Sequence, residues 1–166
     1  MNPHDHAFEL KRRGLYADAV DAYGVAADWA ESDPSLARSI AREQDLDVDT
    51  DRRALPALQH EIARDLRRER RRLIALVWAR WLFPEDDFEP NESRVTRPQH
   101  WAGVGDPRAE PRNFDVWLGS RGFVEVRVHD DRDPPRVEIV WGTPVVVKAF
   151  RERLRGRRPA RRAGLR

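Results

Sequence analysis

The chain has 166 residues, of which 40% are hydrophobic and 36% are charged. This length suits one domain of ordinary size or two small ones. The absence of cysteine excludes disulfides, thiol catalysis, iron–sulfur clusters and cysteine-ligated zinc. There is neither an apolar run of about 18 residues nor a signal-peptide pattern. We therefore expect a cytoplasmic protein, or one within an intracellular assembly, that is not secreted and does not enter a membrane.

The net charge of +2 is the sum of four blocks that alternate in sign. Residues 1–50 and 83–131 are acidic, whereas residues 51–82 and 132–166 are basic. Arginine supplies all the basic residues except Lys11 and Lys148. Such alternation either holds parts of one protein together or presents separate surfaces to separate partners.

The first part of the sequence predicts three helices, over about residues 5–13, 16–31 and 34–44. Gly14 ends the first helix, and Asp33-Pro34 starts the third. The acidic residues 45–51 are expected to form a linker. Small and aromatic residues follow the order A-x2-L-x3-G-x-Y-x2-A-x3-Y-x2-A, at Ala7, Leu10, Gly14, Tyr16, Ala19, Tyr23 and Ala26.

Residues 7–26 resemble a single tetratricopeptide-repeat hairpin, and they are similar to the helical pattern of microtubule-interacting-and-trafficking domains. The resemblance implies an antiparallel helix pair that packs through small residues. A second repeat is missing from the sequence, and a lone unit does not form the concave peptide groove of tandem repeats. The resemblance therefore implies no ligand.

A long amphipathic helix is predicted over about residues 55–82, ended by Pro84. Its apolar residues fall on one side, and its arginines fall on the other, at Arg64, Arg67, Arg68, Arg71 and Arg72. We expect these arginines to contact nucleic-acid phosphate or an acidic protein surface. The alternatives are a solvated face and pairing with the chain's own acidic blocks.

Residues 84–112 are rich in proline and predict an irregular connection in which Trp101 is a candidate interface anchor. The alternative for Trp101 is packing back over a sheet. Strands follow over residues 113–118, 123–129 and 136–141, with Val137, Ile139 and Trp141 expected on one face. A short basic helix should end near residue 154. The tail, residues 155–166, is expected to be disordered alone and to offer polyanion contacts through Arg155, Arg157, Arg158, Arg161 and Arg162.

Residues 122–154 resemble the wing and following helix of a MarR-type regulator. The resemblance implies a recognition helix near residues 106–118, where Pro107 and Pro111 would disrupt a helix. An ordinary β-meander explains the same pattern. Interleaving of basic and aromatic residues, which is typical of base-stacking surfaces, is not visible in the sequence.

Candidate catalytic residues are few. Asp115, with Glu125 and Arg127, is similar to the D…E-x-K arrangement of metal-dependent nucleases, although arginine stands where lysine is needed. His4 and His6 flank Asp5 and could bind an adventitious metal. We assign no catalytic residue, metal, cofactor or small-molecule substrate.

The sequence thus predicts an α+β chain with a helical domain (1–83), an irregular connection (84–112), a small antiparallel β-sheet with a short helix (113–154) and an Arg-rich tail. The leading hypothesis is a non-catalytic protein-interaction or structural subunit of a larger assembly, a class that includes phage and virus particle components. Its partners would be other proteins or copies of itself. The alternatives are a nucleic-acid-binding protein and a metal-dependent nuclease-like enzyme.

Overall fold

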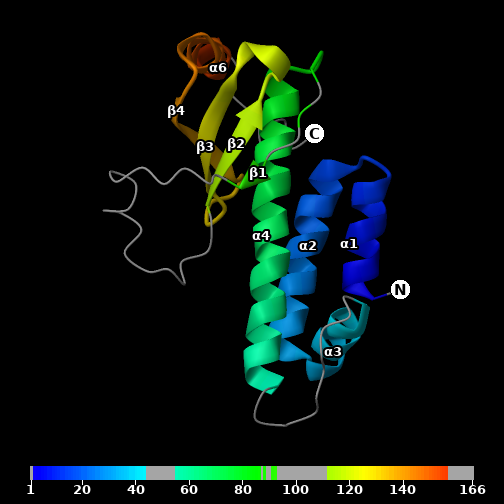
Figure 1. Ribbon diagram of the computed structural model, residues 1–166. Coiled ribbons are helices and arrows are strands. Elements are labelled where there is room, and N and C mark those ends of the chain that lie inside the picture. Colours follow the sequence, from blue (N-terminus) through cyan, green and yellow to red (C-terminus); the bar gives the residue numbers. More distant parts are fainter. Residues whose placement is uncertain (1, 44–54, 87, 89–90, 93–111, 157–166) are drawn as a thin grey trace. The chain divides into compact units, whose positions relative to one another are not determined.

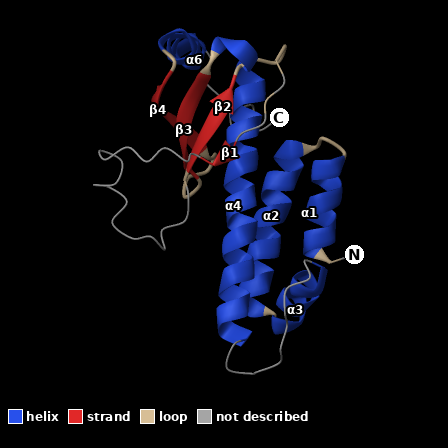
Figure 2. Cartoon of the chain, in the orientation of Figure 1, coloured by secondary structure: helices blue, strands red, loops and turns tan. Residues whose placement is uncertain are grey.

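A computed structural model shows an α+β protein and describes residues 2–43, 55–86, 88, 91–92 and 112–156 (Figure 1). The chain forms two compact units, Met1–Leu73 and Ile74–Arg166. The described part of the first unit is helical, and the strands belong to the second (Figure 2). The division between the units falls inside a long helix, whereas the sequence placed it near residue 83. Among the described residues, no helix combines the length and the apolar content that crossing a membrane requires.

The first unit contains α1 (Pro3–Arg12), α2 (Tyr16–Ser32), α3 (Pro34–Glu43) and the first part of α4 (Leu55–Leu82). Helix α1 is capped by Asn2, whose side chain accepts a hydrogen bond of 2.7 Å from the backbone N–H of Asp5. Gly14 has a positive φ of 76° and turns the chain into α2. Helices α1 and α2 run antiparallel (Figure 1), as expected.

The core of the first unit is built largely from alanine. Because alanine has no side chain beyond Cβ, neighbouring helices can approach closely, and larger residues fill the remaining space. The buried alanines of α1 and α2 are Ala7, Ala19, Ala26, Ala27 and Ala30, and the larger buried residues include Val20, Tyr23, Leu36, Ile40, Ile62 and Leu66.

The second unit contains the end of α4, a four-stranded antiparallel sheet in the order β1-β2-β3-β4, and helix α6. Strand β1 was not expected, because its two residues lack any strand pattern and pair only with the free edge of β2. The other strands lie close to their expected positions. The bounds are β1 (Asn91–Glu92), β2 (Asn113–Trp117), β3 (Phe123–His129), β4 (Arg136–Gly142) and α6 (Pro144–Gly156).

One face of the sheet forms the core of the second unit together with the end of α4 and with α6. The valines at alternate positions of β3 are buried there. The rings of Phe83 and Phe150 lie 4.7 Å apart and join the end of α4 to α6. Arg153 donates a 2.7 Å hydrogen bond to the carbonyl of Leu82, which fixes the same junction. Elsewhere in this unit, the indole N–H of Trp78 donates to the carbonyl of Pro135.

A β-bulge corrects the predicted face of Trp141. Val126 pairs with Ile139, but the neighbouring Glu125 pairs with Trp141, so the register shifts by one residue. The shift puts Trp141 on the face opposite to Ile139, whereas simple alternation placed both residues on one face.

Candidate interaction surfaces

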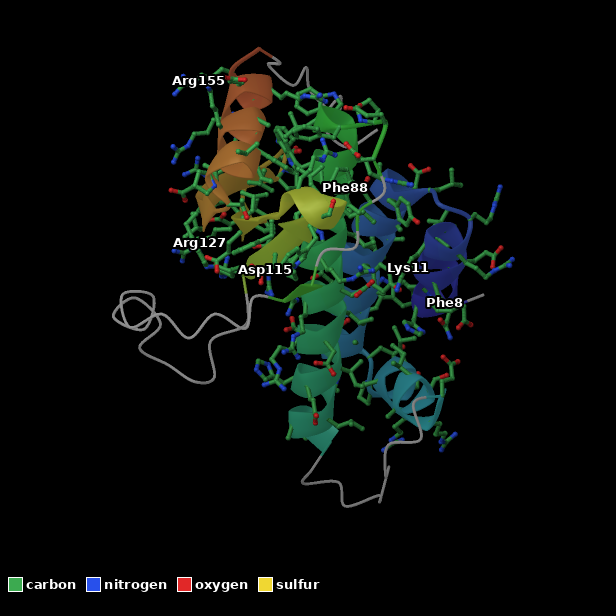
Figure 3. All side chains as sticks on the ribbon, turned by 45° about the horizontal axis from the view of Figure 1, so that its top comes forward. Phe8, Lys11, Phe88, Asp115, Arg127 and Arg155 are labelled. Carbon is green, nitrogen blue, oxygen red and sulfur yellow. The ribbon has the colours of Figure 1, made fainter. Side chains whose placement is uncertain are left out.

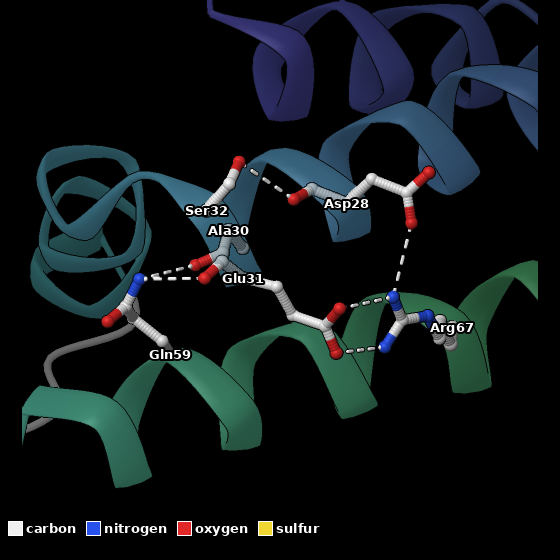
Figure 4. A network of polar contacts seen from close by, with 6 residues as sticks. All are labelled: Asp28, Ala30, Glu31, Ser32, Gln59 and Arg67. Carbon is white, nitrogen blue, oxygen red and sulfur yellow. Dashed lines mark hydrogen bonds and ion pairs between the residues drawn. The ribbon is translucent and has the colours of Figure 1, made fainter.

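Two of the arginines predicted to line α4, Arg67 and Arg72, bind carboxylates of the first unit. Arg67 reaches across to the end of α2, where its guanidinium group donates to both carboxylate oxygens of Glu31 and to Asp28 (Figure 4). The Nη2–Oε2 distance to Glu31 is 2.9 Å. These hydrogen bonds hold the pKa of Glu31 below its ordinary value. Nearby, Gln59 donates to the last carbonyls of α2, from Ala30 and Glu31 (Figure 4).

A second cluster joins α4 to α1 at Glu69. Lys11 approaches Glu69 at 2.8 Å, and Arg72 donates to both of its oxygens. Burial raises the pKa of Glu69, but the hydrogen bonds from Arg72 and Lys11 outweigh burial, so the pKa lies below its ordinary value. Arg71 is buried, with 1% of its surface exposed, and Arg68 lies 3.8 Å from Asp65.

The row of five arginines is therefore partly covered and partly paired within the chain. Arg64, Arg67, Arg68 and Arg72 are half-buried, and Arg71 is buried. Arg67 and Arg72 neutralise carboxylates of the chain itself, which is one of the alternatives that the charge blocks left open. Of the remaining predicted contact residues, Arg155 is exposed on α6, whereas Trp101, Arg157, Arg158, Arg161 and Arg162 lie outside the described residues.

The second unit carries an aromatic row on the sheet face that points away from the core. The ring of Phe123 lies 5.0 Å from Trp117 on β2 and 5.0 Å from Trp141 on β4. Trp117 is 49% exposed, which is unusual for so large an apolar side chain. Arg127, two strand positions beyond Glu125, shares this face and is exposed. The row could not be recognised from the sequence, because its members are far apart in the chain and the bulge changes the face on which Trp141 lies.

A basic groove of about 530 Å³ lies where β4 meets α6. Trp141 lines the groove as well as belonging to the aromatic row. Across from it, Lys148, Arg151 and Arg155 recur every three or four residues and are exposed, and Glu152 is the single acid of the lining. Figure 3 shows Arg127 and Arg155 projecting to the same side of this unit.

The residues of the nuclease-like pattern share the sheet face of the aromatic row. Asp115 and Glu125 are direct partners in the pairing of β2 with β3. Glu125 is only 1% exposed and accepts a hydrogen bond of 3.2 Å from the Asn113 amide. Arg127 points to solvent. In the described part of the chain, no third carboxylate or histidine comes within metal-ligand reach of this pair.

Within the described ranges, one trio has ligand atoms close enough to share a metal ion. The atoms come from His4, Asp5 and Glu43 and lie within 4.8 Å of one another. His4 Nδ1 lies 3.4 Å from Glu43 and 3.9 Å from Asp5. An imidazole with two carboxylates is a ligand set that divalent transition metals accept. The sequence indicated His4 and His6 beside Asp5, whereas the trio contains His4 and Asp5 but not His6, and it includes Glu43, which the fold brings in from α3.

The outer side of the α1–α2 hairpin carries a second hollow, of about 470 Å³, which we call the hairpin groove. Its apolar lining comes from both helices, with Leu10 on α1 and Val25 on α2. Its acidic lining is Asp18 and Asp21, and His6 lies at the α1 side. The complete lining is Pro3, His6, Leu10, Asp18, Asp21, Ala22 and Val25.

Comparisons with known proteins find no relative of this chain. No model of a protein family matches it, and neither a curated protein nor a solved structure is significantly similar.

Proposed function

We propose that the protein is a non-catalytic nucleic-acid-binding protein that contacts single strands through its second unit. The observation that carries this proposal is the position of Trp141, which belongs both to the aromatic row and to the groove lined by Lys148, Arg151 and Arg155. Phosphates bind cations, and unpaired bases stack on aromatic rings. This unit offers both kinds of group next to each other.

The aromatic row supplies the stacking surface. Trp117 is half exposed, and its contact with Phe123 holds the ring in place on the sheet. Stacking of one base on an aromatic side chain contributes about 1–3 kcal/mol and tolerates any base. We therefore expect binding with little sequence preference, and stronger binding to single strands than to duplexes, whose bases are already stacked.

The cations of α6 supply the phosphate contacts. Lys148, Arg151 and Arg155 lie on one exposed side of the helix. The sequence continues from them into the Arg-rich tail, which contains no acid. Because each phosphate contact releases a counterion, binding through these groups must weaken as the salt concentration rises.

The test is fluorescence anisotropy with a labelled oligothymidylate over a series of salt concentrations. The double variant Lys148→Ala/Arg151→Ala should bind about tenfold more weakly or worse and have a shallower salt dependence. Its matched control is Arg12→Ala/Arg13→Ala, which removes two exposed arginines from the first unit.

The contribution of stacking is tested by a tryptophan variant. Trp117→Ala should weaken binding by about tenfold, whereas Trp29→Ala, which removes an equally exposed tryptophan of the first unit, should leave binding unchanged. Binding that is indifferent to salt, or equal losses in the control variants, would contradict the proposal.

A second candidate function is that of a non-catalytic subunit in a larger protein assembly. The hairpin groove favours it, because this groove is acidic and apolar and is therefore suited to a protein rather than to nucleic acid. Val25 and Trp29, each 51% exposed, extend the apolar surface along α2.

A further inference from the structure

We propose that the hairpin groove of the first unit binds a basic amphipathic helix of a partner protein. The proposal goes beyond nucleic-acid binding and concerns different residues. It rests on the groove between α1 and α2, on apolar side chains left exposed beside it, and on carboxylates that the described residues leave without a cation.

Helix α2 has two apolar sides, and only one of them is used by the core. The residues Ala19, Tyr23, Ala26 and Ala30 are buried, as a single core-facing stripe requires. On a neighbouring side of the helix, roughly 100° around it from this stripe, Ala22 and Val25 line the groove, and Trp29 follows one turn after Val25. Val25 and Trp29 are each half exposed. An isolated exposed apolar residue is ordinary, but a stripe that continues a groove is typical of a docking surface.

The acids of α2 fall into two groups. Asp28 and Glu31, which approach α4, are both bound by Arg67. Asp18 and Asp21, which line the groove, are exposed and have no ion-pair partner among the described residues. The N-terminal end of α2 favours the charge of Asp18, since it lies in the first turn, whereas Asp21 lies beyond that turn. The groove thus offers negative charge to a partner.

A helix is the partner structure that fits this geometry. Ridges of side chains on one helix pack into the groove between two others, and an amphipathic helix brings apolar and charged residues at matching intervals. Leu10, Ala22 and Val25 would receive its apolar residues, and Asp18 and Asp21 would receive arginine or lysine. Acidic polymers such as nucleic acid are repelled from the same surface.

The experiment uses the full chain and a labelled helical peptide of about 14 residues, with leucines along one face and arginines flanking them, which spans about 21 Å. We expect binding tighter than about 100 μM, and no binding of a peptide in which glutamate replaces arginine. Asp18→Asn/Asp21→Asn and Val25→Ala/Trp29→Ala should each weaken binding at least tenfold. The control Glu61→Gln/Asp131→Asn removes two exposed acids elsewhere and should bind normally.

Two further measurements test whether the peptide binds at the hairpin groove and whether this binding is separate from nucleic-acid binding. Amide shifts on peptide addition should cluster at His6, Leu10, Ala22 and Val25, and oligothymidylate binding of Asp18→Asn/Asp21→Asn should match that of the unchanged protein. Failure of the peptide to bind, or shifts centred elsewhere, would overturn the proposal and leave nucleic-acid binding untouched. Self-association that is lost in Asp18→Asn/Asp21→Asn would assign the groove to a second copy and would overturn it equally.

Discussion

At the scale of single residues, Tyr23 shows how the helical core acts on an ionisable group. The side chain is 3% exposed between the helices of the first unit. Burial, followed by the nearby charge of Glu69, raises its pKa to about 12, and Arg72 acts in the opposite direction. Because ionisation is disfavoured only in the folded state, the folded unit holds the phenol proton at pH values where the unfolded chain releases it.

We predict that Tyr23 titrates near pH 12 in the folded protein. The chain has two tyrosines, so the variant Tyr16→Phe leaves Tyr23 as the sole source of tyrosinate absorbance. The unfolded chain should lose this proton near 10, the ordinary value for tyrosine. Stability should therefore fall as the pH rises from about 10 towards 12, since the unfolded state binds fewer protons there. An absorbance step near 10 in protein shown to be folded by circular dichroism would contradict this.

At the scale of elements, the spacing of apolar residues in the sequence was sufficient to predict the helices and most of the sheet. The 3- and 4-residue spacing of Ala19, Tyr23 and Ala26 correctly indicated the buried side of α2. Period-two alternation correctly indicated the buried valines of β3. Alternation failed at Trp141, because a bulge is set by how two strands pair and not by either strand alone. The burial of Arg71 was not predicted either, because helical periodicity shows which side of a helix a residue occupies but not what packs against that side.

The close approach of β3 to the end of β4 gives a prediction at this scale. A Cβ atom added to Gly142 would lie 2.3 Å from the Phe123 carbonyl oxygen and 2.8 Å from the Val124 Cα. Both are backbone atoms of the paired strand, which cannot turn aside as a side chain can. Gly142→Ala should therefore destabilise the second unit by about 1–3 kcal/mol. Urea unfolding followed by near-ultraviolet circular dichroism measures this destabilisation. Gly156→Ala, where an added Cβ meets no atom within 4 Å, is the control and should unfold as the unchanged protein does.

At the scale of the whole molecule, the basic side chains divide between those that pair with acids of the chain itself and those that are exposed. Arg67 and Arg72 on α4 bind carboxylates of α2 and of α4 itself. Lys148, Arg151 and Arg155 on α6 are exposed beside Trp141. The charge of a sequence segment does not distinguish these two groups, because ion pairing depends on which acidic residues the fold brings close to each cation. The sequence indicated two groups of arginines, one on the long helix and one from Arg155 onward, and the site that we propose uses the second group together with α6.

Replacing the arginines of the Arg-rich tail tests whether they bind nucleic acid together with the cations of α6. Residues 157–166 contain five arginines and no acid. If these arginines bind phosphates, replacing all five with glutamine should lower the slope of log K against log salt by about 0.7 for each single-strand phosphate that the tail no longer neutralises. Anisotropy titrations with oligothymidylate at several salt concentrations measure the slope. Combining the replacement with Lys148→Ala/Arg151→Ala should lower the slope further, because the two groups bind different phosphates. An unchanged slope after the replacement would show that the tail binds no phosphate and that binding is confined to α6 and the aromatic row.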